Sequence, residues 1–356
     1  MEMKKLLGIS VVTLAFILAL FSTAPAQSPS TKSPSQEKYL LKLAGWFPGS
    51  GHTGIVKWFG DQIELRTNHR VTVDEYFSGS LIPAGQELPA IEQGIADIAA
   101  VSPHYSPGRI PLWGIVGLHG FIPDLFGLTK AMTEFANLPI MKEELAKVNA
   151  IFLAPMGTPP KHLLSVKPVQ RLDDLKGMKV RAVADEAKIM KSIGAVPVFM
   201  AMPEVYTALQ KKTIEGVLHA TASHVTFKWY ETCKNFTKLD YAANGWFLVV
   251  NKNTWAKLPN DIQQIIKEVS SEWSVVWTYA YQVKGEQEAF AKIFPQEGVK
   301  IIEMPAGEKE KLKELASKPL WDEYANDLEK KGLPGKEMIS KWYELSQKWA
   351  KASPFR

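Results

Sequence analysis

The chain has 356 residues, of which 46% are hydrophobic and 22% charged, which is typical of a folded protein and excludes a largely disordered one. This length favours two domains whose hydrophobic core is stable without a disulfide or a structural metal. The single cysteine, Cys233, excludes an intramolecular disulfide and a cysteine-based zinc cluster. The 42 basic and 37 acidic side chains leave a net charge of only +5, without any run of five basic residues, so a nucleic-acid-binding surface is not indicated.

The first 26 residues have the three parts of a secretory signal peptide. Two lysines near the start are followed by an uncharged apolar run at residues 6–21 and by a small-residue site, A-P-A, at residues 24–26. We therefore expect cleavage after Ala26. The alternative is an uncleaved membrane anchor, for which the apolar run is short. Residues 27–38 are rich in Ser, Pro, Lys and Gln and are expected to form a flexible leader.

From residue 39 onwards, strand-like runs alternate with helical patterns. The strand-like runs lie at residues 39–47, 71–76, 98–101, 151–155, 162–166, 180–183, 196–201, 216–220 and 247–250. Helical patterns lie at residues 52–67, 85–94 and 125–148, the last with a break expected at Pro139. This alternation predicts an α/β fold whose sheets are largely parallel.

A long amphipathic helix is predicted at residues 260–294. Asn260 suits a helix start, and the segment contains no proline and a single glycine, Gly285. Apolar residues, Trp273 and Trp277 among them, recur at three- and four-residue spacing, as in a helix of about 35 residues and ~50 Å. Two interpretations remain open: one helix that crosses two domains, or two shorter helices broken near Gly285. Residues 306–350 are expected to be mostly helical.

Residues 49–54 read G-S-G-H-T-G and match the G-x-G-x-x-G pattern of dinucleotide-binding loops. The motif follows a strand and opens a helix, and Asp74 lies twenty residues after its last glycine. However, Pro48 separates the motif from its strand, and His52 and Lys57 occupy a helix start that should pack closely on small residues. A protein that is exported from the cytoplasm also encounters little dinucleotide, which is a further argument against this motif as a dinucleotide site. The favoured interpretation is a loop that leads into a helix.

Motifs of enzymatic chemistry are otherwise missing from the sequence. It contains no G-x-S-x-G elbow, no H-E-x-x-H pair and no phosphate-binding G-x-x-x-x-G-K-[ST] loop. His219 and His224 are five residues apart, but the single cysteine, Cys233, does not complete a zinc-finger set of ligands with them. We therefore expect no enzymatic activity, no cofactor and no metal site.

The segment from residue 169 to residue 216 contains four short patterns in a specific order. They are D-L-K-G-M-K-V-R at 174–181, G-A-V-P-V-F-M at 194–200, E-V-Y-T-A-L-Q at 204–210 and the pair Glu215-Gly216. Together they resemble the DctP-type extracytoplasmic solute-binding proteins of TRAP transporters, and the likeness extends over about residues 39–334. It implies the α/β two-lobed periplasmic-binding-protein (Venus-flytrap) fold, in which a long helix bridges both lobes.

The resemblance also implies a division of the chain and a function. Lobe I would comprise residues 39–158 and about 247–286, lobe II residues 159–246 and about 287–332, and residues 333–356 would form a C-terminal helical tail. The protein would capture an organic acid in the periplasm and deliver it to the small and large TRAP membrane subunits, without being membrane-embedded itself once its signal peptide is cleaved. The alternatives are a secreted oxidoreductase and a ligand-sensing module on the same scaffold.

Seven residues are candidates for contact with the ligand. In the family, the arginine of the K-x-R pattern holds the ligand carboxylate, and here it is Arg181, whose guanidinium can grip both oxygens. A second basic position falls at Lys161, which keeps the charge but lacks the fork, and His219 is a further donor with a pH-sensitive charge. The opposite lobe and an apolar position complete the set: Trp46, Ser102, Tyr105 and Met202.

This set predicts the class of ligand. One carboxylate would meet Arg181, and the rest of the ligand would be partly apolar or aromatic, or a small hydroxy- or keto-acid. A dicarboxylate remains an alternative ligand if the Lys161 side chain reaches its second carboxylate. A polyhydroxylated sugar acid is disfavoured because the predicted wall offers few hydrogen-bond donors.

Overall fold

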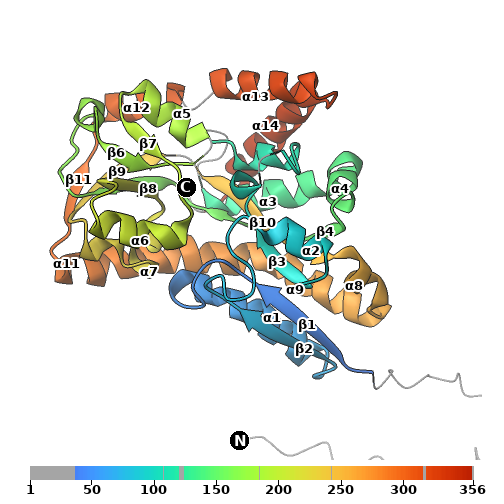
Figure 1. Cartoon of the computed structure of the whole chain (residues 1–356). Coiled ribbons are helices and arrows are strands. Elements are labelled where there is room, and N and C mark those ends of the chain that lie inside the picture. The colour runs from blue at the N-terminus through green and yellow to red at the C-terminus, as the bar shows by residue number, and fades with distance from the viewer. Residues whose placement is uncertain are drawn as a thin grey trace, which may run out of the picture. The chain divides into compact units, whose positions relative to one another are not determined.

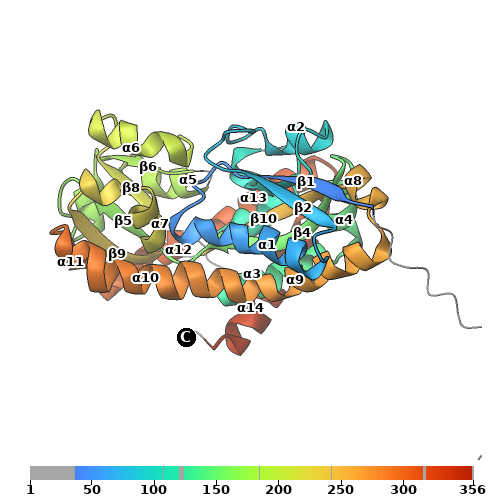
Figure 2. The ribbon, with the colours of Figure 1, turned by 90° about the horizontal axis from the view of Figure 1, so that it is seen from below.

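The computed structural model describes residues 37–106, 108–119, 124–183, 185–241, 243–315 and 318–354. The expected signal peptide and nearly all of the expected leader lie outside these ranges. Within them, two β-sheets lie side by side and a long helix runs along both (Figures 1 and 2). None of the helices in these ranges combines the length and the apolar composition that a membrane span requires.

The first sheet has five strands in the order β2-β1-β3-β10-β4. The strands are β1 (Tyr39–Ala44), β2 (Val71–Tyr76), β3 (Ile98–Val101), β4 (Ala150–Thr158) and β10 (Asn244–Asn251). β1 is parallel to β2 and β3, whereas β10 is antiparallel to β3 and β4. The helices connected to this sheet are α1 (Val56–Arg66), α2 (Glu87–Glu92), α3 (Leu125–Ala136), α4 (Pro139–Ala146) and α8 (Lys252–Lys257). Every residue of β3 and β10 is buried, as expected for strands in the middle of a covered sheet.

The second sheet has six strands in the order β11-β9-β5-β8-β6-β7. They are β5 (Lys161–Ser165), β6 (Lys179–Arg181), β7 (Val196–Val198), β8 (Gly216–His219), β9 (Asn235–Tyr241) and β11 (Lys300–Glu303). β5 is antiparallel to β8 and β9, and the other pairs are parallel. Helices α5 (Asp185–Ser192), α6 (Met202–Gln210) and α7 (Thr221–Thr226) follow strands of this sheet.

The predicted strands are confirmed, but the predicted strand direction is partly wrong. Each of the nine strand-like runs contains a strand, whereas β9 and β11 were not expected. The sheets are mixed and not largely parallel, because β5 and β10 each run antiparallel to both of their neighbours. An alternation of apolar segments indicates layers, but it does not reveal the direction in which a strand pairs.

The antiparallel strands arise where the chain passes between the sheets. β4 ends at Thr158 and β5 begins at Lys161, while β9 ends at Tyr241 and β10 begins at Asn244. Thr158 pairs with Asn244 in the first sheet, and Lys161 pairs with Tyr241 in the second. Two antiparallel chain segments therefore continue side by side from one sheet into the other, and they bring strand ends from both sheets to one place.

The long helix forms as one continuous rod, so the alternative with a break at Gly285 is wrong. It consists of α9 (Asn260–Thr278), a wider π-helical stretch at Tyr279–Lys284, α10 (Gly285–Glu288), a second π-helical stretch at Ala289–Ile293 and α11 (Phe294–Gln296). Figure 2 shows it running beneath both sheets. Gly285 keeps helical angles, and a Cβ there would lie 2.4 Å from Cβ of Ala222 in α7. The glycine thus allows two helices to touch and does not end either of them.

The remaining helical expectations are also met. Pro139 is the first residue of α4, as its missing N–H favours. The C-terminal segment forms α12 (Ala306–Leu315), α13 (Lys318–Lys330) and α14 (Gly335–Ala352). α14 packs on α3, where the rings of Phe135 and Trp342 are 5.2 Å apart. In the long helix, Trp273 and Trp277 are fully buried and their rings stack at 5.7 Å.

Candidate ligand-binding site

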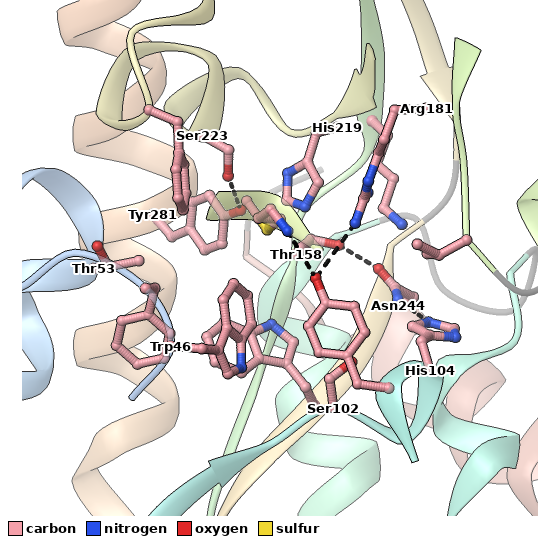
Figure 3. A pocket seen from close by; sticks show the side chains of 17 residues that line it. Trp46, Thr53, Ser102, His104, Thr158, Arg181, His219, Ser223, Asn244 and Tyr281 are labelled. Atoms are coloured by element: carbon pink, nitrogen blue, oxygen red, sulfur yellow. Dashed lines mark hydrogen bonds between the residues drawn. The ribbon is translucent and has the colours of Figure 1, made fainter. Parts of the chain in front are cut away.

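A pocket lies where strands of both sheets end. It encloses about 490 Å³ of space between atoms, part of which is open solvent. The seven predicted residues all line it: Trp46, Ser102, Tyr105, Lys161, Arg181, Met202 and His219. Trp46, Ser102 and Tyr105 follow strands of the first sheet, and the other four come from the second sheet or from a helix that follows it (Figure 3).

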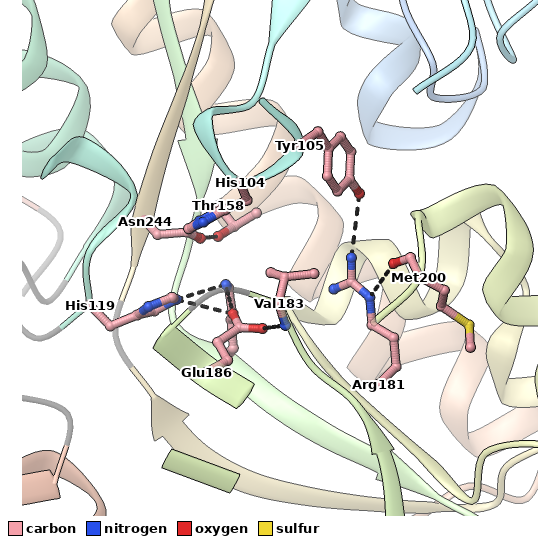
Figure 4. A network of polar contacts seen from close by, with 10 residues as sticks. His104, Tyr105, His119, Thr158, Arg181, Val183, Glu186, Met200 and Asn244 are labelled. Atoms are coloured by element: carbon pink, nitrogen blue, oxygen red, sulfur yellow. Dashed lines mark hydrogen bonds and ion pairs between the residues drawn. The ribbon is translucent and has the colours of Figure 1, made fainter. Parts of the chain in front are cut away.

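Arg181 is the last residue of β6, and its side chain is 2% exposed. Its Nε donates a hydrogen bond to the carbonyl oxygen of Met200 at 3.2 Å, and its Nη2 donates to the Tyr105 hydroxyl at 3.4 Å (Figure 4). Both acceptors are neutral, and no carboxylate of the described residues forms an ion pair with this guanidinium. A buried cation without a counter-ion is costly, so this arrangement favours an anion in the pocket.

Tyr105 connects the two sheets across the pocket. Its hydroxyl oxygen accepts hydrogen bonds from Arg181 and, at 3.3 Å, from the backbone N–H of Met202 at the start of α6. Burial raises the pKa of Tyr105, although the nearby Arg181 charge opposes the effect, so the phenol keeps its proton. The proton can then be donated to a further acceptor in the pocket.

Lys161 lines the pocket, but its charge is already matched by a carboxylate. Its Nζ contacts Oε1 of Glu186 and lies 2.9 Å from Nε2 of His119. Burial by itself would raise the pKa of Glu186, but Lys161 and His119 hold that pKa well below its ordinary value. Sequence reasoning missed Glu186 and His119. The only available signal was that Glu186 follows the Arg181 strand at the start of a helix.

His219 is neutral at ordinary pH. Burial lowers the pKa of this imidazole well below its usual value, and the charges of Lys161 and Arg181 lower it further. The expected pH-sensitive charge is therefore not supported near neutrality. The buried Nδ1 has no hydrogen-bond partner among the residues that the structure describes, so His219 can serve a ligand as a neutral donor or acceptor.

One wall of the pocket is aromatic. The ring of Trp46 lies 5.3 Å from Phe47, 5.3 Å from Tyr105 and 5.5 Å from Trp246, all measured between ring centres. Trp46 is 5% exposed, and its buried Nε1 has no hydrogen-bond partner within the described ranges. The wall therefore combines a large apolar face with one unused N–H donor.

Several polar residues in the pocket were not predicted. The Thr158 hydroxyl donates to Oδ1 of Asn244, whose Nδ2 lies 2.6 Å from Nε2 of His104, and the hydroxyls of Ser223 and Tyr281 are 2.6 Å apart. Thr158 and Asn244 belong to the paired segments that pass between the sheets. Since the sequence does not reveal that pairing, it carries no signal for these two residues. No group of three or more His, Cys, Asp or Glu side chains in the described part of the chain could hold a metal ion.

The glycine motif at 49–54 packs against protein. Gly51 has a φ of +61°, and a Cβ on it would lie 2.3 Å from Oγ1 of Thr226 in α7. The Thr53 hydroxyl, at the edge of the pocket, contacts the carbonyl oxygens of Pro48 and Ser50 at 2.6 and 2.9 Å. The motif thus brings α7 of the second sheet close to a loop of the first, and a phosphate has no room at Gly51.

The chain forms two β-sheets of mixed strand direction, a long helix that bridges them and a pocket between them that favours an anion. This combination defines the class of two-lobed solute-binding proteins. The chain belongs to the DctP family, bacterial extracellular solute-binding protein family 7, whose model matches residues 48–327. This is a family of binding receptors, and the match confirms the resemblance that the motifs indicate.

Three known proteins illustrate the likeness. The C4-dicarboxylate-binding periplasmic protein DctP of Rhodobacter capsulatus is 28% identical over 279 residues, which cover 76% of this chain and 79% of that protein. A TRAP periplasmic solute-binding protein of Desulfovibrio salexigens, solved as an open complex, is 26% identical, with a TM-score of 0.74 over 89% of this chain and 99% of that one. A TRAP solute-binding protein of Rhodoferax ferrireducens, solved with copurified benzoate, is 23% identical, with a TM-score of 0.79 over 88% and 99%.

Proposed function

We propose that this protein captures a small organic acid in the periplasm and presents it to the two membrane subunits of a TRAP transporter. The observation that carries the proposal is the Arg181 guanidinium, which is 2% exposed and contacts only neutral oxygens of the described residues. A ligand carboxylate would supply the missing charge through charge-assisted hydrogen bonds. The Tyr105 hydroxyl, which keeps its proton, would donate a further bond to the same carboxylate.

The rest of the ligand would lie against the aromatic wall. Trp46, Phe47 and Trp246 offer apolar faces, and the benzoate found in the Rhodoferax protein is a ligand of the expected kind. The unused Nε1 of Trp46 and Nδ1 of His219 would serve a hydroxyl or keto group. These features favour aromatic acids and small hydroxy- or keto-acids over aliphatic acids without a second polar group.

Release to a membrane partner requires that the two sheets move apart. Ligand contacts made from both sheets would favour their approach, because a ligand shifts such an equilibrium only through contacts that differ between the two states. We assign lobe I to residues 39–158 and about 247–286, lobe II to residues 159–246 and about 287–332, and a helical tail to residues 333–356. The hinge would then lie at the two crossings between the sheets, where the chain passes from β4 to β5 and from β9 to β10.

A thermal-shift screen against about a hundred organic acids tests the proposal. The full chain is expressed in a bacterium, and the protein is purified from the periplasm. A bound acid at ~100 times its dissociation constant should add ~2.7 kcal/mol to the free energy of unfolding, which raises the melting temperature by some degrees. Arg181→Ala should abolish the shift, whereas Arg66→Ala, which removes a surface arginine paired with Glu272, should preserve it.

Two results would contradict the proposal. One is an acid that stabilises Arg181→Ala as strongly as the unchanged protein. The other is the absence of any shift with all acids together with a shift caused by NADH, which would favour the oxidoreductase alternative. A sensing role is separated from transport by uptake of the identified acid in cells with and without the membrane subunits.

A further inference from the structure

A fully buried ion pair borders the pocket. The Nζ of Lys161 contacts Oε1 of Glu186, and Nε2 of His119 lies 2.9 Å from this Nζ and 3.1 Å from this oxygen. The side chains of Glu186 and His119 are 0% exposed and that of Lys161 is 2% exposed. One carboxylate is thus held between an ammonium group and an imidazole, out of contact with bulk water.

The backbone fixes the second oxygen of the same carboxylate. Oε2 of Glu186 accepts a hydrogen bond from the N–H of Val183 at 3.1 Å, in the turn that leads from β6 to α5 (Figure 4). Both oxygens are therefore engaged, and the pKa of Glu186 lies well below its ordinary value because Lys161 and His119 outweigh the effect of burial. At neutral pH the carboxylate is ionised and held in one position.

The two cations that line the pocket differ in their partners. Lys161 pairs with Glu186, whereas the hydrogen-bond acceptors of Arg181 are the Met200 carbonyl and the Tyr105 hydroxyl, both neutral. Among the described residues, the pocket therefore has one uncompensated positive charge. A ligand with a second carboxylate near Lys161 would meet the Glu186 carboxylate, and repulsion between two like charges in a buried place is strong.

We infer that Glu186 is a specificity-determining residue, which restricts the pocket to monocarboxylates by occupying Lys161 with a carboxylate of the protein itself. The inference rests on the proposed function and deepens it, because it names the charge of the ligand. It also answers a question that the sequence left open, which is whether Lys161 binds the second carboxylate of a diacid. In this arrangement the Glu186 carboxylate occupies the position beside Lys161 that the second ligand carboxylate would need.

Pairs of acids that differ by one carboxylate test the inference. We would use butyrate and succinate, benzoate and isophthalate, and phenylacetate and 4-carboxyphenylacetate, with dissociation constants measured by calorimetry on the protein purified from the periplasm. The unchanged protein should bind the monoacid of a pair at least tenfold more tightly than the diacid. Glu186→Gln, which keeps an oxygen for the Val183 N–H, should reduce this ratio at least tenfold, mainly through tighter binding of the diacid.

The double variant Lys161→Met with Glu186→Gln is the matched control. It removes the pair as a unit, so the gain in diacid binding expected for Glu186→Gln should be lost, because no free ammonium group remains to attract the second carboxylate. If circular dichroism shows that Glu186→Gln does not fold, the ratio of monoacid to diacid affinity decides the matter. It is then compared between the unchanged protein and the double variant.

The outcomes that overturn the inference differ from those that overturn the proposed function. The inference fails if the unchanged protein binds a diacid as tightly as its monoacid, if folded Glu186→Gln leaves the ratio unchanged, or if the folded double variant keeps the gain in diacid binding. The proposed function fails if the unchanged protein binds none of the six acids and none of the larger screen.

Discussion

The Tyr105 hydroxyl oxygen lies 3.4 Å from Nη2 of Arg181, although Tyr105 follows a strand of the first sheet and Arg181 ends a strand of the second. The same oxygen accepts a hydrogen bond from the backbone N–H of Met202, also from the second sheet. One phenol group thus contacts the buried Arg181 guanidinium and the start of α6 at once. Ligand capture and the approach of the two sheets are therefore expected to depend on the same side chain.

Replacement of Tyr105 by phenylalanine should weaken ligand binding about tenfold. The change removes the acceptor for two N–H groups and the donor to the ligand carboxylate, a loss of about 1.5 kcal/mol for a hydrogen bond to a charged group. Calorimetry with the acid identified in the screen measures it. Tyr206→Phe is the control, because the Tyr206 hydroxyl bonds to Glu231 and the residue does not line the pocket. Equal affinities of Tyr105→Phe and the unchanged protein would contradict the assigned role.

Gly51→Ala should also weaken ligand binding, about tenfold, without any contact to the ligand. Its Cβ would lie 2.3 Å from Oγ1 of Thr226, so the loop of the first sheet could not approach α7 of the second as closely. The φ of +61° adds backbone strain. Thr226→Ala in the same chain should restore part of the affinity, because it removes the nearest atom. Calorimetry compares the three proteins, and the prediction fails if Gly51→Ala binds normally.

Gly285→Ala should lower the free energy of unfolding by about 1–3 kcal/mol. The new Cβ would lie 2.4 Å from Cβ of Ala222, and overpacking in a buried contact has a cost of this size. Gly307→Ala in α12 is the matched control, because no atom that the structure describes outside its own helix backbone and adjoining residues lies within 4 Å of its Cβ position. Alanine there should stabilise the protein by about 0.5–1 kcal/mol. Urea unfolding measures both. Stabilisation by Gly285→Ala would show that α7 does not press on the long helix.

Glu87→Gln should change the pH dependence of stability. The Glu87 carboxylate, 2% exposed, accepts hydrogen bonds from the Gly85 N–H at 2.9 and 3.0 Å. Burial raises its pKa from 4.5 to about 7, although these backbone hydrogen bonds oppose the effect. A raised folded-state pKa means that the folded state binds the proton more tightly, so stability from this group is present below pH 4.5 and is lost as the pH rises through 7.

The glutamine variant avoids that loss. Relative to the unchanged protein, Glu87→Gln should therefore gain about 2–3 kcal/mol in free energy of unfolding between pH 5 and pH 8. Urea unfolding at both pH values measures the gain. Glu92→Gln serves as the control, since Glu92 lies in the same helix but is exposed and pairs with Arg109. Parallel pH profiles of Glu87→Gln and the unchanged protein would contradict the prediction.

Most of the fold could be predicted from local patterns. Period-two and apolar runs predict nine of the eleven strands, and the spacing of Trp273, Trp277 and their neighbours predicts the long helix, because these signals depend only on which side chains must be buried. β9 was not predicted, although Lys238 and Asp240 alternate with the buried Leu239 and Tyr241 at the period of a strand. The antiparallel direction of β5 and β10 has no local signal, since the partner of a strand is chosen by contacts between distant segments.

The sequence by itself determined the class of the protein and indicated seven of the residues that line its pocket, because the patterns that resemble the family can be recognised without knowledge of which residues touch. Only the tertiary structure decided the state of their charges. Glu186 neutralises Lys161, burial keeps His219 neutral, and Arg181 alone of the three has its charge available for a ligand. Charge and protonation depend on distance and on burial, and both arise only when β5, β6 and β8 pack together with α5.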